Sequence, residues 1–599
     1  MDALPSGAAT RAAADELPLG QYAAIGDGRS VALVGADGSI DWWCVPNLDS
    51  TPLFDRLLDP LDGGRFSICL AQACSVERHY RANSNVLEHV YTTATGSARI
   101  TDSLNSGISG RLPWSELARR VEGLQGSVTF NIEIRPGRRQ STASPWREAS
   151  PDGDVLHIDG VIAALRHDAG FERSAQDDRH LAGRLVTQAG SRNVLAVLAS
   201  ANEPLILPAL ADIDRRIDRS DQSWQEWCGN LQISGPYANA IRRSALALKL
   251  LLFSPTGAIA AAATCGLPER IGGDKNFDYR YAWLRDVAFT IKAFLRVGAT
   301  EEAKAAFSWM TSTVRRHGPP LRAMYRLDGE LAPDATSLDL PGYRRSQPVS
   351  VGNHARSQLQ LGMFGDILEA AALFVQSGHV LDLVTRRLLA DLTDRCADTW
   401  QMRDSGMWEL QHAEHYTMSR MECWTALDRA VKLAAKGQIE TNHADRWQRE
   451  RDRIRDWIDT HCWSPVLQAY TMHPATERLD AALLLATRLG FERTDRLALT
   501  RDAIVRELTD GPLVYRYSGM REEEGTFTAC GFWLVEAYAL LGDRPAAVRQ
   551  MDAMLAICES NLGLLNEQID ARGGAMLGNM PQALSHLALI HAALSIDGI

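Results

Sequence analysis

The feature that most constrains this fold is a change of hydrophobic periodicity near Pro236. Up to about residue 230, short segments such as "SVALVGADGSIDWWCV" and "GSVTFNIEIRPG" alternate apolar and polar residues between Gly, Asp and Pro turn signals. Alternation with period two is typical of antiparallel strands. After Pro236 the apolar positions recur at i, i+3 and i+4, which is the spacing of a helix. We therefore expect an all-β part followed by an all-α part.

The helical part divides into about a dozen apolar-periodic runs. They lie at 237–254, 283–297, 300–316, 355–377, 380–403, 420–436, 441–461, 478–489, 494–509, 529–541, 544–560 and 580–596. Short links alternate with long ones that are rich in Gly, Pro, Asp and aromatic residues, at 257–282, 317–354, 404–419, 510–528 and 561–579. Such alternation predicts paired helices in a closed double ring, with the long loops gathered at one end. Long loops on a rigid scaffold usually carry function.

The same patterns predict four segments along the chain. We expect a disordered N-terminal segment at 1–18, a β-sandwich domain at 19–212, a helical linker at 213–235 and an all-α domain at 236–599. The sandwich is expected because many short strands follow one another at roughly even spacing. The N-terminus carries acidic residues and lacks an apolar core, so it does not resemble a secretory signal.

Charge, hydropathy and cysteine usage exclude several classes of protein. The net charge is -11, and no run of Lys or Arg marks a phosphate-binding surface, so we expect no nucleic-acid partner. No stretch reaches the ~18 apolar residues of a membrane span. The 10 Cys are scattered without a CxxC pair, which is typical of reduced thiols in a cytoplasmic protein. The oligomeric state stays open, homo-oligomers included.

Two local patterns suggest cofactor chemistry, and neither is complete. "HAEH", from His412 to His415, places two His three residues apart but lacks a third ligand at recognisable spacing. "GGDKN" at 272–276 lacks the spacing of a phosphate-binding loop and has no apolar strand before it. We therefore expect no metal and no cofactor.

The long loops share one chemistry, because each brings aromatic rings together with carboxylates or Arg. They contain "FDYRYAWLRD", "SGMWELQHAEHYT", "VYRYSGMREEEGTF" and "NLGLLNEQIDARGGAMLGN". Apolar rings stack on the C–H faces of a sugar, and charged groups bind its hydroxyls. Two carboxylates from separate loops are also the minimum for glycoside hydrolysis. The loops thus indicate a sugar site.

Four motifs in order sharpen this hypothesis. "YRYAWLRD", "WEL…CWTALDRA", "EEGTFTACGFWLVEA" and "LLNEQID…LGNMPQALSHLALIHAA" resemble the motif set of glycoside hydrolase family 15, which contains glucoamylases and prokaryotic trehalases. The N-terminal "IGDGRSVALVGADGSIDWWCVPNLDSTPLFDRLL" resembles the β-sandwich domain of its prokaryotic members. The resemblance extends from about residue 19 to 598. It implies an (α/α)6 barrel with a pocket at one end and inversion at the anomeric carbon.

The resemblance also implies residue roles. Glu409 matches the general acid and Glu567 the general base that activates water. The seven other matched residues are expected to bind or line the sugar: Tyr279, Trp283, Arg285, Asp286, Trp408, Arg516 and Gln568. Gln568 is the neighbour of the base. Two positions depart from the family pattern: Leu410 follows the acid where fungal glucoamylases have a second Glu, and Gly362 stands where we expect Asp.

Several residues compete with these assignments. Glu414 and Glu422 are rivals of Glu409, although Glu422 is expected on a solvated helix face. Glu559 and Asp570 are rivals of Glu567. The triplet 522–524 is most simply a charged loop, with one member able to reach the pocket. Trp42 and Trp43 are expected in the sandwich core, and the alternative is that their segment shapes the outer part of the site.

The preferred hypothesis is an exo-acting, inverting hydrolase that releases glucose from the non-reducing end of α-glucosides, in the manner of a glucoamylase acting on malto- or isomalto-oligosaccharides or α-glucan. The alternative in the same family is a trehalase. A glycoside phosphorylase needs only one catalytic carboxylate, so the presence of Glu567 argues against it. A non-catalytic sugar-binding protein would be expected to lack one of the two carboxylates, and both are present.

Overall fold

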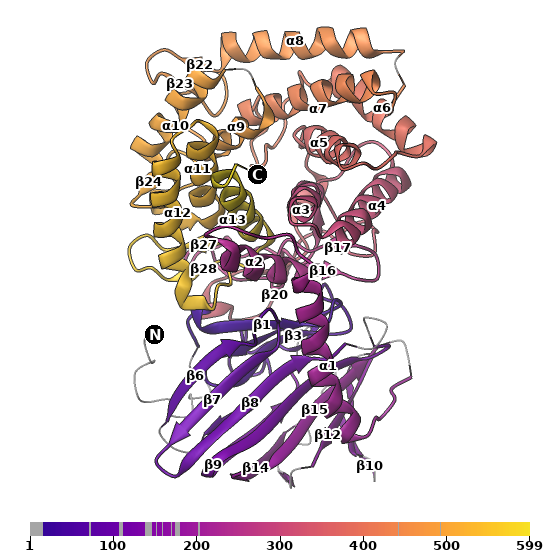
Figure 1. The fold of residues 1–599 in the computed structure, drawn as a ribbon, viewed down its shortest axis with the longest axis vertical. Coiled ribbons are helices and arrows are strands. Elements are labelled where there is room, and N and C mark those ends of the chain that lie inside the picture. The colour runs from indigo at the N-terminus through magenta and orange to yellow at the C-terminus, as the bar shows by residue number, and fades with distance from the viewer. Residues whose placement is uncertain are drawn as a thin grey trace.

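A computed structural model describes residues 16–598 apart from 71–73, 107–111, 138–145, 151–152, 159, 169–170, 174–179, 202–203, 441 and 492. The strands of the N-terminal part and the helices of the C-terminal part form two stacked bodies (Figure 1). The prediction of an antiparallel β part followed by an α part is confirmed. Of the predicted disordered segment 1–18, residues 1–15 lie outside the described part of the chain.

The N-terminal part is built from antiparallel strands. They are β1 (Tyr22–Gly26), β2 (Val31–Gly35), β3 (Ser39–Cys44), β4 (Pro52–Phe54), β5 (Arg65–Leu70), β6 (Ser75–Tyr80), β7 (Leu87–Thr93), β8 (Gly96–Leu104), β9 (Ser115–Arg135), β10 (Trp146–Ser150), β11 (Gly153–Ile158), β12 (Val161–His167), β13 (Phe171–Arg173), β14 (Leu181–Gln188) and β15 (Arg192–Ser200). The main path runs β1-β2-β3-β5-β9-β15-β12-β11-β10.

The long strand β9 joins the two halves of this sheet. Residues 115–122 of β9 pair with β15, and residues 127–134 pair with β14. The same strand pairs with β8 through its first half and with β5 through its second half. The strands enclose an apolar core that includes Trp43, Phe66 and Phe130. One strand of 21 residues therefore ties both halves of the sheet to one core.

Helix α1 (Leu210–Gly229) lies along the outside of the sheet (Figure 1). Its Ile213 and Ile217 pack into a small apolar cluster with Trp114 of the β part. Arg120 of β9 donates to Asp214 at 2.6 Å and to Asp218 at 2.7 Å. A helical linker is expected from the sequence at 213–235. The observed helix α1 spans 210–229 instead and packs against the sheet.

The C-terminal part contains the helices α2 (Ala238–Leu251), α3 (Leu284–Arg296), α4 (Thr300–His317), α5 (Met363–Gln376), α6 (Leu383–Thr399), α7 (Thr417–Ala435), α8 (Ala444–His461), α9 (Ala486–Leu489), α10 (Thr494–Leu508), α11 (Thr528–Leu540), α12 (Arg544–Cys558) and α13 (Ala583–Ile596). The 3-10 segment η5 (Ala481–Leu485) precedes α9. Contacts run from α3 to α5, α7, the η5–α9 segment, α11, α13 and back to α3, which closes a circuit. Helices α2, α4, α6, α8, α10 and α12 pack outside it, each against a neighbour in the circuit.

Composition explains which helices lie inside. Helix α13 has 13 of its 14 residues buried, because it is apolar around its whole circumference. Helix α8 buries only Trp447, Ile454 and Ile458, and its other faces are charged. A helix that is apolar all round must be covered on every side, whereas an amphipathic helix needs one neighbour. The hydrophobic pattern of each helix therefore indicates whether it lies in the circuit or outside it.

Every sequence-predicted helical run contains a helix, and two runs differ in detail. The run expected from 355 begins as a helix only at Met363, because the 3-10 turn η4 (His354–Ser357), capped by Asn353, precedes it. The run at 478–489 divides into η5 and the short α9. Both differences lie beside the long loops.

Trp42 and Trp43 are both fully buried and point to different cores. Trp43 belongs to the core of the β part, as expected. Trp42 packs with the core of the helical part and donates from Nε1 to the Ala263 carbonyl at 2.9 Å. Neighbouring residues of a strand face opposite sides, so β3 contributes one ring to each body.

Candidate active site

The five long loops meet at one end of the helical part. Loop 257–282 is hydrogen-bonded to three of the other four. Asn276 Nδ2 donates to the Pro348 carbonyl, Gly525 N to the Glu269 carbonyl, and Asn579 Nδ2 to the Phe277 carbonyl, each at 3.0 Å. Trp283, just after that loop, donates to Glu409 of loop 404–419. The gathering of the loops follows the expectation from their spacing.

Glu409 is held in an unusual backbone conformation. Its φ is +61°, which is uncommon for a residue other than Gly, Asn or Asp. The turn is fixed by hydrogen bonds from Glu409 N to the Gly406 carbonyl at 3.3 Å and from Leu410 N to the Ser405 carbonyl at 3.0 Å. Gln358 Nε2 donates to the Glu409 carbonyl at 2.9 Å. A conformation that costs energy and is held from several sides is typical of a functional position.

The carboxyl group of Glu409 is half-buried and hydrogen-bonded. Trp283 Nε1 donates to its Oε1 at 2.6 Å. Burial raises the pKa of Glu409, while the nearby Arg285 guanidinium and the Trp283 N–H lower it. Burial prevails, so the protonated form is favoured relative to a free Glu. A carboxyl group that keeps its proton at higher pH is suited to act as a general acid.

Glu567 lies immediately before β27 (Gln568–Ile569), the middle strand of a small sheet with β26 (Thr526–Phe527) and β28 (Met576–Leu577). It is 1% exposed, and Asn579 N donates to its Oε2 at 3.0 Å. Gly578, at φ +69°, lies against the same carboxyl group and leaves no space for a Cβ there. Its other oxygen, Oε1, is buried and has no hydrogen-bond partner among the described residues.

The pKa of Glu567 is raised well above its usual range, first by burial and then by the charge of Glu269. The Asn579 N–H and the Arg516 guanidinium oppose this rise. A raised pKa makes the ionised carboxylate a stronger base. The unpaired Oε1 is the atom of Glu567 that is free to accept a proton.

Arg285 and Asp286 begin helix α3, and their side chains interact directly. Arg285 Nη2 donates to Asp286 Oδ2 at 3.0 Å, and its Nη1 donates to the Met407 carbonyl at 2.9 Å. Arg285 is partly exposed, whereas Asp286 is buried. The Tyr279 and Trp283 rings pack edge to face at 5.3 Å between centroids. The charges of both Glu409 and Glu567 raise the pKa of Tyr279, after burial, so Tyr279 lies near both carboxyl groups.

Trp408 is fixed by contacts on several sides. Its Nε1 donates to Asp480 Oδ1 at 2.7 Å. Its ring packs edge to face against Phe527 at 5.3 Å and lies 5.8 Å from Trp533. The Arg516 guanidinium lies 5.6 Å from the ring centroid. Trp408 therefore links the loop of Glu409 to the small sheet that carries Glu567.

Arg516 is buried in a network of carboxylates. It donates from Nε to Glu524 Oε1 at 2.6 Å and from Nη2 to Glu269 Oε2 at 2.8 Å. Lys275 Nζ contacts Glu524 Oε2 at 2.8 Å. Glu524 is thus the member of the acidic triplet that reaches the site. Sequence reasoning missed Glu269, although its position in a long loop shortly before "FDYRYAWLRD" was a signal that could have found it.

The described contacts separate the two predicted carboxylates from their rivals. Glu414 is one-third exposed and lies 3.9 Å from Arg403 at the surface. Asp570 accepts hydrogen bonds from Arg572 N and Gly573 N, which identifies it as a turn residue. Glu559 is exposed. None of the three shares the contacts that surround Glu409 and Glu567.

The expectation that Glu422 lies on a solvated face is wrong. Glu422 is 7% exposed and packs against Gly365 of α5. Helix α7 belongs to the inner circuit and buries 15 of its 19 residues, so it has almost no solvated face. The polar side chains within "SRMECWTAL" suggested an amphipathic helix, but the neighbouring helices cover that face as well.

Glu422 and Asp366 line a cavity of about 30 Å³ beside Arg285, and Gly362 also lines it. Burial raises the pKa of Asp366 to about 7. Burial, followed by the charge of Asp366, raises the pKa of Glu422 well above its usual range. Two carboxyl groups in one small cavity that raise each other's pKa lose their protons as a pair.

This pair predicts a pH-dependent stability. The unfolded chain ionises such groups near pH 4, whereas the folded Asp366 does so near pH 7. Stability is therefore lost as the pH rises from about 4 to about 7. Glu422→Gln removes one ionisable group, so we expect the free energy of unfolding to rise by about 1–3 kcal/mol at pH 8 and by less at pH 5. Urea unfolding measures both values.

The matched control is Glu440→Gln, because Glu440 is exposed and lies 3.9 Å from Arg387 at the surface. It should leave the free energy of unfolding unchanged within about 0.5 kcal/mol at both pH values. An equal change for Glu422→Gln at pH 5 and pH 8 would contradict the raised pKa of this pair.

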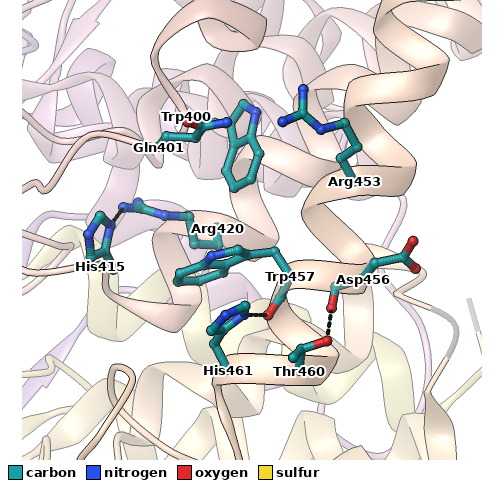
Figure 2. Close-up of a pocket in the computed structure, with 9 residues that line it drawn as sticks. All are labelled: Trp400, Gln401, His415, Arg420, Arg453, Asp456, Trp457, Thr460 and His461. Carbon is teal, nitrogen blue, oxygen red and sulfur yellow. Dashed lines mark hydrogen bonds between the residues drawn. The ribbon is translucent and has the colours of Figure 1, made fainter.

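The cavity of about 580 Å³ shown in Figure 2 contains none of the predicted site residues. It is lined by Trp400, Gln401, His415, Arg420, Arg453, Asp456, Trp457, Thr460 and His461. Its two Arg are already paired, Arg420 with Asp404 at 3.6 Å and Arg453 with Glu450 at 2.7 Å. This cavity therefore lies outside the candidate active site.

His415 of the "HAEH" pattern accepts a hydrogen bond from Arg420 at 2.7 Å in that same cavity (Figure 2). Within the described part of the chain, no group of three or more His, Cys, Asp or Glu is placed to hold a metal ion. In the same residues, no helix combines the length and the apolar character needed to cross a membrane.

Comparisons with known proteins give consistent similarities. The model of glycosyl hydrolases family 15 matches residues 235–555, and a trehalase-like N-terminal model matches residues 12–160. A trehalase from Thermoplasma acidophilum is 30% identical, over 94% of this chain and 98% of its own. A trehalase from Mycobacterium tuberculosis is 32% identical, over 97% of this chain and 89% of its own.

A solved bacterial glucoamylase in complex with acarbose has a similar fold. Its TM-score is 0.72 at 13% sequence identity, over 99% of this chain and 95% of that chain. The whole chain, including the β part, therefore has the fold of that protein.

Proposed function

Because this chain belongs to glycoside hydrolase family 15, we propose that it hydrolyses α,α-trehalose to two glucose molecules, with Glu409 as general acid and Glu567 as general base. The observation that carries this proposal is the full-length similarity to proteins named trehalase, at 30–32% identity. It favours the trehalase alternative over the glucoamylase-type activity that we preferred from the sequence. The glucoamylase with a similar fold supports the fold alone.

The finer architecture belongs to the same proposal. We propose that the closed circuit of α3, α5, α7, η5–α9, α11 and α13, with its outer partners, is an (α/α)6 barrel. The β part is proposed as a sandwich domain over 19–212, the segment 213–235 with most of α1 as the link, and 236–599 as the catalytic domain. The five loops at one end of the ring support this division, since they contribute the proposed catalytic residues.

The proposed reaction uses each carboxyl group once. Glu409 donates its proton to the oxygen between the two sugars. Glu567 accepts a proton from a water molecule that attacks the anomeric carbon from the opposite side, which inverts the configuration. Arg285 and Asp286 are proposed to bind hydroxyls of the sugar that is attacked. Tyr279, Trp283, Trp408 and Arg516 shape the remaining walls, and Gln568 lies beside the base.

The charge distribution argues against a phosphorylase. Phosphate would need a cationic group to bind it in place of the attacking water. Arg516 is paired with two carboxylates, and Lys275 is paired with Glu524. Glu567 would add a further negative charge beside them. A neutral sugar and a water molecule suit this site better than an anion.

We also propose that the protein acts in a reducing compartment such as the cytoplasm. None of the ten Cys forms a disulfide bond, and nine of them are buried. A protein that folds in an oxidising compartment seldom retains so many free thiols. Its proposed partner is a carbohydrate.

Steady-state kinetics on a panel of substrates tests the substrate. The panel contains trehalose, maltose, isomaltose, maltotriose and soluble starch, each with and without phosphate. We expect kcat/KM for trehalose to exceed that for every other substrate by at least about 100-fold, because a site built for the second glucose leaves polar groups unpaired with another sugar. A preference for maltotriose or starch would instead support the glucoamylase-type assignment. Dependence on phosphate would indicate a phosphorylase.

A further inference from the structure

We propose that Glu269 is a positioning residue that, together with Arg516, controls the charge and the position of the general base Glu567. This proposal rests on the proposed roles of Glu567 and Glu409. Glu269 does not need to contact the substrate for this role. It acts on the reaction through the group beside it.

The backbone places Glu269 against the strand that carries the base. Gly578 N donates to the Pro268 carbonyl at 2.8 Å, and Gly525 N donates to the Glu269 carbonyl at 3.0 Å. Gly578 lies against the Glu567 carboxyl group, and Gly525 lies against the Gln568 amide. The segment 268–269 is thus bound on one side to the neighbour of Glu567 and on the other to the neighbour of Gln568.

The side chain of Glu269 is fixed by a hydrogen bond from Arg516, and the Gln568 side chain lies beside it. It is 1% exposed, and its Oε2 accepts a hydrogen bond from Arg516 Nη2 at 2.8 Å. Its Oε1 is buried without a hydrogen-bond partner among the described residues, as is the Oε1 of Glu567. A buried carboxylate oxygen without a donor is costly, and such groups in native proteins usually have a functional reason.

The surrounding charges show why Glu567 depends on Glu269. Arg516 and Lys275 supply two positive charges, and Glu269 and Glu524 supply two negative charges. Glu567 is a third carboxyl group next to a network that is already balanced. Tyr279 also lies near Glu269, Glu409 and Glu567, and Tyr517 lies near Glu269 and Glu524. The ionisation of Glu567 is therefore opposed by Glu269 and supported by whatever positive charge Arg516 retains.

The titration behaviour of the pair agrees with this arrangement. Burial raises the pKa of Glu269 to about 7, against the attraction of Arg516. After burial, the charge of Glu269 is the largest cause that raises the pKa of Glu567. Two buried carboxyl groups of this kind lose their protons in steps that belong to the pair.

The test is the pH profile of kcat/KM, whose acid limb reports the ionisation of the base in the free enzyme. Glu269→Gln removes a negative charge and leaves Arg516 less neutralised, and both changes lower the pKa of Glu567. We expect the acid limb to move to lower pH by about one unit. A decrease of kcat/KM at all pH values, with the limb unmoved, would overturn the proposal and leave Glu269 a structural residue.

Three further variants complete the design. Glu269→Asp restores the charge, so its acid limb should return toward that of the wild type even where kcat/KM stays lower. Lys275→Met removes a positive charge from the network and should move the limb to higher pH, which keeps the proposal testable if Glu269→Gln does not fold. Glu523→Gln is the matched control, because Glu523 is 59% exposed and lies 3.5 Å from Lys275. It should leave the limb in place.

Failure of this proposal can be distinguished from failure of the proposed function. If the wild type hydrolyses another α-glucoside and not trehalose, the proposed substrate is wrong, and the acid limb measured on that glucoside still tests Glu269. If the wild type hydrolyses trehalose and neither Glu269→Gln nor Lys275→Met moves the limb, the role of Glu269 is wrong and the proposed function stands.

Discussion

Glu409→Gln is expected to lower kcat on the preferred glucoside by about 10³- to 10⁴-fold, with a thermal unfolding midpoint close to that of the wild type. Gln keeps the shape of the side chain and can still accept the hydrogen bond from Trp283, but it has no proton to donate to the glycosidic oxygen. Steady-state kinetics and thermal unfolding of the purified variant measure both quantities.

The matched control for this variant is Glu414→Gln in the same loop. Glu414 is one-third exposed and pairs only loosely with Arg403. Its variant should keep kcat within about threefold of the wild type. If Glu414→Gln lost the activity and Glu409→Gln retained it, the general acid would have been assigned to the wrong residue of loop 404–419.

Glu567→Gln is the second large effect. We expect a loss of kcat of about 10³-fold or more, since the amide cannot take a proton from the attacking water. The Asn579 N–H can still bond to the amide oxygen, so the small sheet should stay intact. The retained fold is checked by circular dichroism, and substrate binding by calorimetry on the inactive variant.

Glu559→Gln is the control for the base, because Glu559 is exposed and close in sequence to Glu567. Its kcat should be unchanged within about threefold. Near-native turnover by Glu567→Gln would show that another group activates the water, and Glu269 would then be the first candidate, because, of the surrounding charges, its charge has the largest effect on Glu567.

The helices could be predicted because their apolar residues repeat over long stretches. Period and length together identify a run such as 583–596 as a buried helix without knowledge of its neighbours. The start of α5 could not be read in this way, since the 3-10 turn at 354–357 depends on a cap from Asn353 and on the loops around it. Contacts with the surrounding loops override local helix propensity where the chain enters the candidate site.

The candidate site could be predicted in part. Glu409, Glu567 and the residues of "YRYAWLRD" stand in recognisable motifs, and the structure brings their loops together. Glu269 was missed although it stands shortly before "FDYRYAWLRD", because its role arises from a tertiary contact with Arg516, which is far away in sequence. Glu422 was misjudged for a related reason: the sequence shows one helix, whereas burial depends on the helices around it.

The positive φ of Glu409 was also beyond sequence reasoning. Nothing in "GMWEL" announces a left-handed residue at the Glu, and Gly406 is the residue that the pattern would favour for it. The conformation is imposed by the turn and by Gln358 and Trp283 from other segments. This conformation directs the Glu409 carboxyl group toward Trp283, which donates a hydrogen bond to it.

Proton NMR of the first products formed from α,α-trehalose tests the proposed reaction most directly. Inversion at the attacked carbon gives one β-glucose from that sugar and one α-glucose from the departing sugar. Spectra recorded before the anomers equilibrate should therefore show α- and β-glucose in equal amounts. Release of α-glucose alone, formation of glucose 1-phosphate when phosphate is added, or no cleavage of trehalose would contradict hydrolysis by Glu409 and Glu567 as proposed.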